Sequence, residues 1–226
     1  AKGYKAVAFD IFDTLLKRDC AHPADLFALM EVTHQAALGF AGARVAAEAE
    51  TRQTLGREVT LAEIYAHPAL RGTDPAAECA AELAMIAPNR PVAQAAAACH
   101  ARGQKVYAVS DMYLPKEQIE AMLQKCGLDF LDGVFVSCEY RVQKRSGKLF
   151  KLFLQQTALR PAEVLFVGDS PRADFAGAAL AGLRGFLLAQ PTPLPHTPTP
   201  PGGPGGSGPA AAPSSSRSSH ARACGM

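Results

Sequence analysis

The sequence lacks three features that would each point to a particular class of protein. It has no CxxC pair among its six cysteines, no run of about 18 apolar residues, and no stretch of concentrated basic charge. The scattered cysteines are expected to be reduced, structurally passive thiols of a cytoplasmic protein. The missing apolar run and the absence of a visible signal peptide argue against a membrane partner. The formal net charge of +2, with acids and bases interspersed, argues against nucleic acid.

What is present is ample material for a packed core. The chain has 226 residues, of which 48% are hydrophobic, enough for one large domain or two small ones. From about residue 190 the composition changes to Pro, Gly, Ser and Ala, which bury too little apolar surface to offset the entropy of ordering. We therefore expect residues 190–226 to be a disordered tail or a linker.

Short β-like runs alternate with helical patterns along the rest of the chain. Strands separated by helices of this length imply crossover connections, and hence a mainly parallel sheet covered on both faces. The sequence thus predicts a doubly wound, Rossmann-like α/β fold. The helical patterns include residues 115–127 and 148–159. The predicted strands are residues 4–10, 104–110, 133–137, 163–169 and 184–189.

An insertion follows the first strand. Residues 17–90 show no strand signal and are rich in Ala, Leu, Glu and Arg, which favours a small helical cap subdomain. The core domain would then consist of residues 1–16 and 91–189.

Polar side chains end several of the apolar runs. In an open parallel sheet, ligands bind where the carboxyl ends of the strands meet, so these residues are expected to converge. Asp10, Ser110 and Asp169 end such runs. Lys144 comes from a segment after the third run, and Asp174 follows shortly after Asp169. Carboxylates, a lysine and a hydroxyl in one crevice can bind a divalent cation together with an anionic group, and a carboxylate there can act as a nucleophile.

Four motifs in this order resemble the haloacid dehalogenase (HAD) superfamily of hydrolases, across residues 4–189. The first is FDIFDTL with Asp10 and Thr14, and the second is the strand that ends at Ser110. The third is KRSGKLF with Lys144, and the fourth is GDSPRAD with Asp169 and Asp174. Each motif alone is weak, whereas four in order on the right elements are a specific signal.

The resemblance implies a mechanism. Asp10 would be the nucleophile, Lys144 would steady its charge, and Ser110 would hydrogen-bond the transferred group. Asp10, the backbone carbonyl of Phe12 and Asp169 would hold Mg²⁺, with Asp174 in support. Thr14 and Ser170 are expected to contact the substrate. The helical cap would close over the site and exclude water.

One position departs from the phosphatase pattern. Those enzymes carry an acid two residues after the nucleophile, where this chain has Phe12. Asp13 and Asp111 are the candidate replacements, and each has an alternative structural role at a turn or helix start. An aromatic residue at this place is similar instead to the metal-independent 2-haloacid dehalogenases, and in that case Arg44 could answer the charge of the substrate carboxylate from the cap. A helical Arg is more often a solvated surface residue.

The combination of FDIFDTLLKR, SDMYLP and GDS most resembles a bacterial subgroup of predicted HAD hydrolases associated with surface-polysaccharide synthesis. That resemblance implies a small phosphorylated metabolite, such as a phosphosugar, as the substrate. The leading hypothesis is Mg²⁺-dependent hydrolysis of a phosphoester or phosphoanhydride through an aspartyl intermediate. The alternatives are dehalogenation and a non-catalytic domain of a polysaccharide-building protein.

Overall fold

Five strands form one sheet in which every neighbouring pair is parallel, in the order β5-β4-β1-β6-β7. The computed structural model describes residues 3–189, so the predicted tail at 190–226 lies outside the described residues. The central position of β1 and the parallel ladders confirm the predicted doubly wound α/β fold. The strands are β1 (Ala6–Phe9), β4 (Lys105–Ser110), β5 (Gly133–Val136), β6 (Val164–Gly168) and β7 (Arg184–Leu187).

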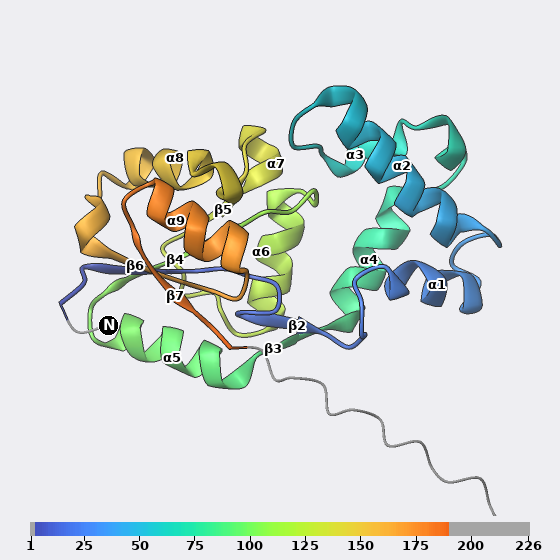
Figure 1. The fold of residues 1–226 in the computed structure, drawn as a ribbon. Helices are drawn as coiled ribbons and strands as arrows, with labels where there is room; N and C mark the ends of the chain where they lie inside the picture. Colours follow the sequence, from blue (N-terminus) through green and yellow to red (C-terminus); the bar gives the residue numbers. More distant parts are fainter. Residues whose placement is uncertain (1–2, 190–226) are drawn as a thin grey trace, which may run out of the picture. The chain divides into compact units, whose positions relative to one another are not determined.

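Both faces of the sheet are covered by helices. Because side chains alternate along a strand, Val7 and Phe9 of β1 join one buried cluster while Ala6 and Ala8 join another. Helices on opposite sides of the sheet complete the two clusters (Figure 1). They are α5 (Arg90–Ala101) and α6 (Lys116–Lys125) on the first face, and α8 (Lys148–Thr157) and α9 (Gly177–Leu180) on the second.

The insertion after β1 is helical, but it is entered and left through two short strands. β2 (Leu16–Arg18) pairs antiparallel with β3 (Ile86–Pro88). The interpretation that this insertion contains no strand was therefore wrong, because three residues are too few to show a period-2 pattern. Its helices, which gather apart from the sheet in Figure 1, are α1 (Asp25–Val32), α2 (Phe40–Leu55), α3 (Leu61–Tyr65) and α4 (Pro75–Met85). None of the helices within residues 3–189 has the length and apolar character needed to cross a bilayer.

The strand register brings the carboxyl ends of three strands to the same edge. Phe9, the last residue of β1, is level with Ala108 of β4 and Val167 of β6. The residues that follow these positions therefore lie side by side at this edge. The remaining elements are α7 (Ser137–Tyr140), 3₁₀ turns at Pro68–Leu70, Lys144–Ser146 and Pro161–Glu163, and a π-helical turn at Pro171–Ala176.

Candidate active site

Asp10 lies buried at the end of the central strand. Its backbone N–H donates to the carbonyl of Val167 at 2.8 Å, so the β1–β6 ladder continues one residue past the strand. Only 6% of the residue is exposed. Burial raises the pKa of Asp10 to about 7; the Lys144 ammonium opposes this rise, and the charges of Asp174 and Asp169 add to it. The strand thus holds a carboxylate in rigid surroundings where ionisation depends on a nearby positive charge.

Lys144 supplies that charge. Its ammonium donates to Oδ1 of Asp10 and to Oδ1 of Asp174, each at 2.5 Å. Burial opposes the charged form of Lys144, but the adjacent carboxylates outweigh it and keep its pKa above the ordinary value. A buried ammonium between two carboxylates stays charged. The structure therefore brings together three sequence-predicted residues that are far apart in the chain.

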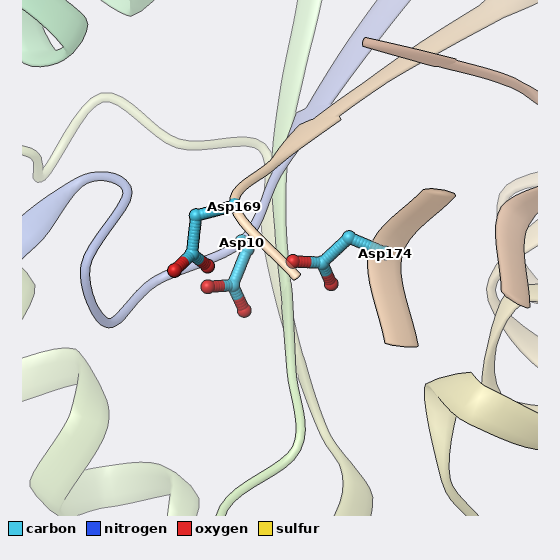
Figure 2. A group of neighbouring side chains, drawn as sticks. All are labelled: Asp10, Asp169 and Asp174. Atoms are coloured by element: carbon cyan, nitrogen blue, oxygen red, sulfur yellow. The ribbon is translucent and has the colours of Figure 1, made fainter. Parts of the chain in front are cut away.

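A third carboxylate, that of Asp169, completes an acidic cluster. Oxygen atoms of Asp10, Asp169 and Asp174 lie within 4.8 Å of one another, and Figure 2 shows Asp10 between the other two. Gly168 makes this approach possible, since a Cβ there would lie 2.4 Å from Oδ2 of Asp174. The same carboxylate oxygen accepts from the backbone N–H of Ser170 at 2.9 Å. Glycine at position 168, in the fourth motif, is thus required for this packing.

The cluster fits a hard divalent cation. Carboxylate oxygens are the ligands that Mg²⁺ and Ca²⁺ prefer. Asp10 and Asp174 share the single ammonium of Lys144, so this pair of carboxylates carries one negative charge more than Lys144 offsets. A divalent cation would offset that excess. The donor set alone suits Ca²⁺ as well as Mg²⁺.

The three predicted hydroxyl residues, Ser110, Thr14 and Ser170, differ in their burial and hydrogen bonding. Ser110 is buried at the last position of β4, one strand away from Asp10. Thr14 is completely buried, and within residues 3–189 its Oγ1 has no hydrogen-bond partner. Its carbonyl accepts from Nδ2 of Asn89 at 2.7 Å, which ties the first motif to the exit of the insertion. Ser170 instead caps the following turn, because its Oγ accepts from the backbone N–H of Ala173 at 3.2 Å.

The two candidate replacement acids are held differently. Asp13 is exposed with φ of +58°, a left-handed conformation that Asp tolerates better than most residues. Asp111 is half-buried and its Oδ1 accepts from the backbone N–H of Lys144 at 2.8 Å. Burial raises the pKa of Asp111, while Lys144 opposes the rise. Phe12 stacks its ring under the guanidinium of Arg18 at 4.0 Å.

A cleft of about 510 Å³ joins the first and second motifs to the insertion. Its walls are mostly apolar, and two arginines, Arg18 and Arg52, also line it. Sequence reasoning had no signal for Arg52, because only the folded chain brings this α2 residue into the same cleft as Asp111, Met112 and Tyr113. The core domain contributes Phe12, Asp111, Met112 and Tyr113 to the lining of this cleft. The insertion contributes, among others, Phe27, Val45, Glu48 and Ala49.

Arg44 does not lie at the surface, contrary to the expectation for a helical arginine. It is completely buried in the insertion, where its guanidinium donates to both oxygens of Glu78, at 2.6 and 2.8 Å, and to Glu48 at 3.1 Å. The ring of Tyr113 lies 4.7 Å from the same guanidinium. These partners stabilise the charge where water cannot. Arg44 is therefore engaged in the interior of the insertion.

Gly177 is a site-supporting residue that sequence reasoning missed. A Cβ at this position would lie 2.3 Å from the carbonyl oxygen of Lys144. The glycine therefore lets α9 pack directly against the turn that carries the lysine. A glycine inside a helical Ala-rich stretch was the only signal, and it does not reveal which backbone approaches.

The fold and the site define an α/β domain with a carboxylate-and-lysine centre at the carboxyl edge of its sheet. The model of one family, haloacid dehalogenase-like hydrolase, matches residues 4–182. Since this is most of the chain, the protein belongs to the haloacid dehalogenase-like hydrolases, a superfamily of generally enzymatic proteins. The predicted superfamily is thereby confirmed.

The individual proteins that this chain resembles either match less than half of its length or have low sequence identity to it. Haloacid dehalogenase-like hydrolase domain-containing protein 3 of Bos taurus is 32% identical over 97 residues, which is 42% of this chain and 38% of that protein. The alignment thus spans well under half of the relative's length. The L-2-haloacid dehalogenase of Xanthobacter autotrophicus has a TM-score of 0.60 at 22% identity, covering 84% of this chain and 79% of that one. A HAD phosphatase from Thermococcus onnurineus has a TM-score of 0.58 at 19% identity, covering 81% and 86%. These two likenesses show the fold.

Proposed function

We propose that this protein is a Mg²⁺-dependent hydrolase that cleaves a phosphoester or phosphoanhydride of a small metabolite. The observation that carries the proposal is the buried Asp10 carboxylate, held by Lys144 and flanked by Asp169 and Asp174. A cluster with excess negative charge suits a cation, and a cation together with an ammonium suits a phosphoryl group. The structural likeness to a HAD phosphatase supports the same class of substrate.

In the first step an oxygen of Asp10 attacks phosphorus, and the bond from phosphorus to the leaving oxygen breaks. Lys144 holds Oδ1 of Asp10, so Oδ2 is the oxygen that attacks. Ser110 and Thr14 donate hydrogen bonds to the transferred phosphoryl oxygens. In support of this role, the buried Oγ1 of Thr14 has no hydrogen-bond partner among residues 3–189. Mg²⁺ held by Asp10, the carbonyl of Phe12, Asp169 and Asp174 would offset negative charge on the phosphoryl group.

In the second step water attacks the phosphorus of the aspartyl phosphate, the bond from phosphorus to Asp10 breaks, and inorganic phosphate leaves. A general acid protonates the leaving oxygen in the first step and, as its conjugate base, removes a proton from water in the second. We assign this role to Asp111 rather than to Asp13. Asp111 lines the cleft and is half-buried next to Lys144, whereas Asp13 is exposed.

This assignment predicts a dependence on the leaving group. Asp111→Asn keeps an oxygen that can accept from the Lys144 N–H, so the turn should remain in place. We expect hydrolysis of an alkyl phosphate to fall about 10²-fold, since general acid catalysis is worth that much or more. Hydrolysis of p-nitrophenyl phosphate, whose leaving group needs no proton, should fall far less. Steady-state kinetics on both substrates measure the difference, and equal losses on the two would contradict the role. Asp13→Asn is the matched control.

The substrate would occupy the cleft between the first motif and the insertion. Its volume of about 510 Å³ is in the range of small-molecule sites. The mostly apolar walls suit a compact organic group. Arg18 and Arg52 are already paired, Arg18 with Glu82 and Arg52 with Glu48 and Glu58, so a second function on the substrate need only be polar. A phosphosugar is the metabolite we propose. We also propose that the protein works in the cytoplasm, which suits the five free cysteines of residues 3–189.

Removal of the metal tests the proposal directly. Purified protein should hydrolyse p-nitrophenyl phosphate or acetyl phosphate with added Mg²⁺, and EDTA should remove this activity because the acidic cluster then lacks its countercharge. Addition of excess Mg²⁺ should restore it. Halide release from a 2-haloacid in EDTA, without phosphatase activity, would contradict the proposal and identify a dehalogenase. Turnover of neither class across a broad metabolite screen would favour a non-catalytic domain.

Dehalogenation remains the second candidate because of Phe12 and the likeness to an L-2-haloacid dehalogenase. Two observations weigh against it. Arg44, the residue considered as a partner for a haloacid carboxylate, has its donors engaged by Glu78 and Glu48. The excess negative charge around Asp10 would also repel an anionic haloacid unless a cation were bound.

A further inference from the structure

A second cleft, of about 440 Å³, is lined by residues on either side of Lys144 but not by Lys144 itself. One wall consists of residues 141–148 of the sheet domain without Lys144 and Gly147. The other wall belongs to the insertion and includes residues 56–58 together with Arg52, near the end of α2. The two walls are joined by a hydrogen bond from Nε2 of Gln143 to Oε2 of Glu58 at 2.6 Å. Arg52 lines both this cleft and the proposed substrate cleft, but no residue of this second cleft takes part in the two chemical steps above.

The lining of this second cleft is strongly basic. One acidic residue, Glu58, faces five basic residues: Arg52, Arg57, Arg141, Arg145 and Lys148. Both walls contribute positive charge, so the basic character is not a property of one surface helix. Like charges gathered in a concave site raise the local concentration of anions.

Part of this positive charge is already paired. Arg52 donates to Glu58 at 2.6 Å, and both Arg57 and Arg141 contact Glu63. Arg145 and Lys148 are exposed, and within the described part of the chain their side chains make no ion pair or hydrogen bond. These two residues are therefore the cations of the cleft that a ligand can recruit without breaking an existing pair.

We propose that this second cleft binds a phosphate-type polyanion through Arg145 and Lys148. A guanidinium presents a fork of donors to phosphate oxygens, and an ammonium adds a point charge. The volume suits a small ligand with two or three phosphate groups. Two sources share this chemistry: a distal phosphate group of the substrate, and a separate anionic metabolite.

Calorimetric titration of the full chain with inorganic tripolyphosphate, without Mg²⁺, tests the binding site. Omitting Mg²⁺ keeps the acidic cluster at Asp10 repulsive to the probe. We expect one site on the wild type and an affinity at least about tenfold weaker in Arg145→Gln/Lys148→Gln, because two charge-assisted contacts are lost. Lys151→Gln, an exposed lysine on α8 that does not line the cleft, is the matched control and should bind like the wild type. Undetectable binding to the wild type, or equal binding to the double variant, would overturn the proposal.

Steady-state kinetics on two substrates distinguish the two possible ligands, which are a distal phosphate group of the substrate and a separate anion. If the ligand is a distal phosphate of the substrate, the double variant should raise KM for a hexose bisphosphate and leave KM for phenyl phosphate unchanged. If it is a separate anion, both KM values should stay unchanged although the calorimetric affinity is lost. The calorimetric result does not need turnover, so it decides the binding site even if the proposed hydrolase activity fails.

Discussion

Asp10→Asn is expected to abolish hydrolysis of p-nitrophenyl phosphate, with a loss of about 10⁴-fold or more, as for other enzymes that lose a catalytic nucleophile. Asn matches Asp in size and its Oδ1 can still accept from the Lys144 ammonium, as Oδ1 of Asp10 does at 2.5 Å. The fold should therefore persist. Only the negative charge and the nucleophilic oxygen are lost.

Two measurements separate this result from a general loss of structure. Intact mass spectrometry of acid-quenched enzyme should detect a covalent phosphoryl group on the wild type and none on Asp10→Asn. Asp129→Asn, an exposed aspartate outside the site, should retain the activity and the phosphoryl adduct. Substantial activity in Asp10→Asn would end the aspartyl mechanism.

Lys144→Met is expected to reduce both activity and stability. Removal of one preorganised hydrogen-bond donor typically costs about 10²–10³ in rate, and here the nucleophile also loses its positioning contact. The buried carboxylates of Asp10 and Asp174 would face each other without the ammonium that bonds to both. Breaking a buried ion pair in this way destabilises a protein by about 3–5 kcal/mol. Kinetics with p-nitrophenyl phosphate and urea denaturation measure the two effects.

Magnesium provides a sharper readout for the same variant. Without Lys144, three neighbouring carboxylates remain, so a divalent cation should raise the unfolding midpoint more in Lys144→Met than in the wild type. Lys151→Met, on the exposed side of α8, should behave like the wild type in every measurement. A Lys144→Met variant with wild-type stability and no added response to Mg²⁺ would contradict the view that Lys144 neutralises the acidic cluster.

The central parts of the site could be predicted from local patterns. Asp10, Ser110 and Asp169 each follow a short apolar run, and parallel strands place such positions at one edge of the sheet. Lys144 was harder, since it lies in a 3₁₀ turn with no periodic signal and was found through its spacing in a family motif. Its contact with Asp174 depends on Gly168 and Gly177, whose lack of side chains permits a close approach that spacing does not reveal.

Other features had no signal that sequence reasoning could use. The strands β2 and β3 are three residues each, too short for a pattern, and they pair across 67 residues of intervening chain. Arg44 resembles any solvated helical arginine until Glu78, from another helix, meets it in the interior. The sequence does not show in which direction the carboxylate of Asp111 points, so its contact with the backbone N–H of Lys144 is evident only in the folded chain.

The sequence by itself determined that the sheet is mainly parallel and which superfamily the chain resembles, because short apolar runs, the polar residues that end them and the motifs are local properties of the chain. The tertiary structure decided which charged side chains contact one another. It placed Lys144 between two carboxylates, buried Arg44 in the interior of the insertion, and placed Arg145 and Lys148 in a basic cleft. The physical reason is that electrostatic interactions depend on distance and burial, and both arise only when segments remote in sequence pack together.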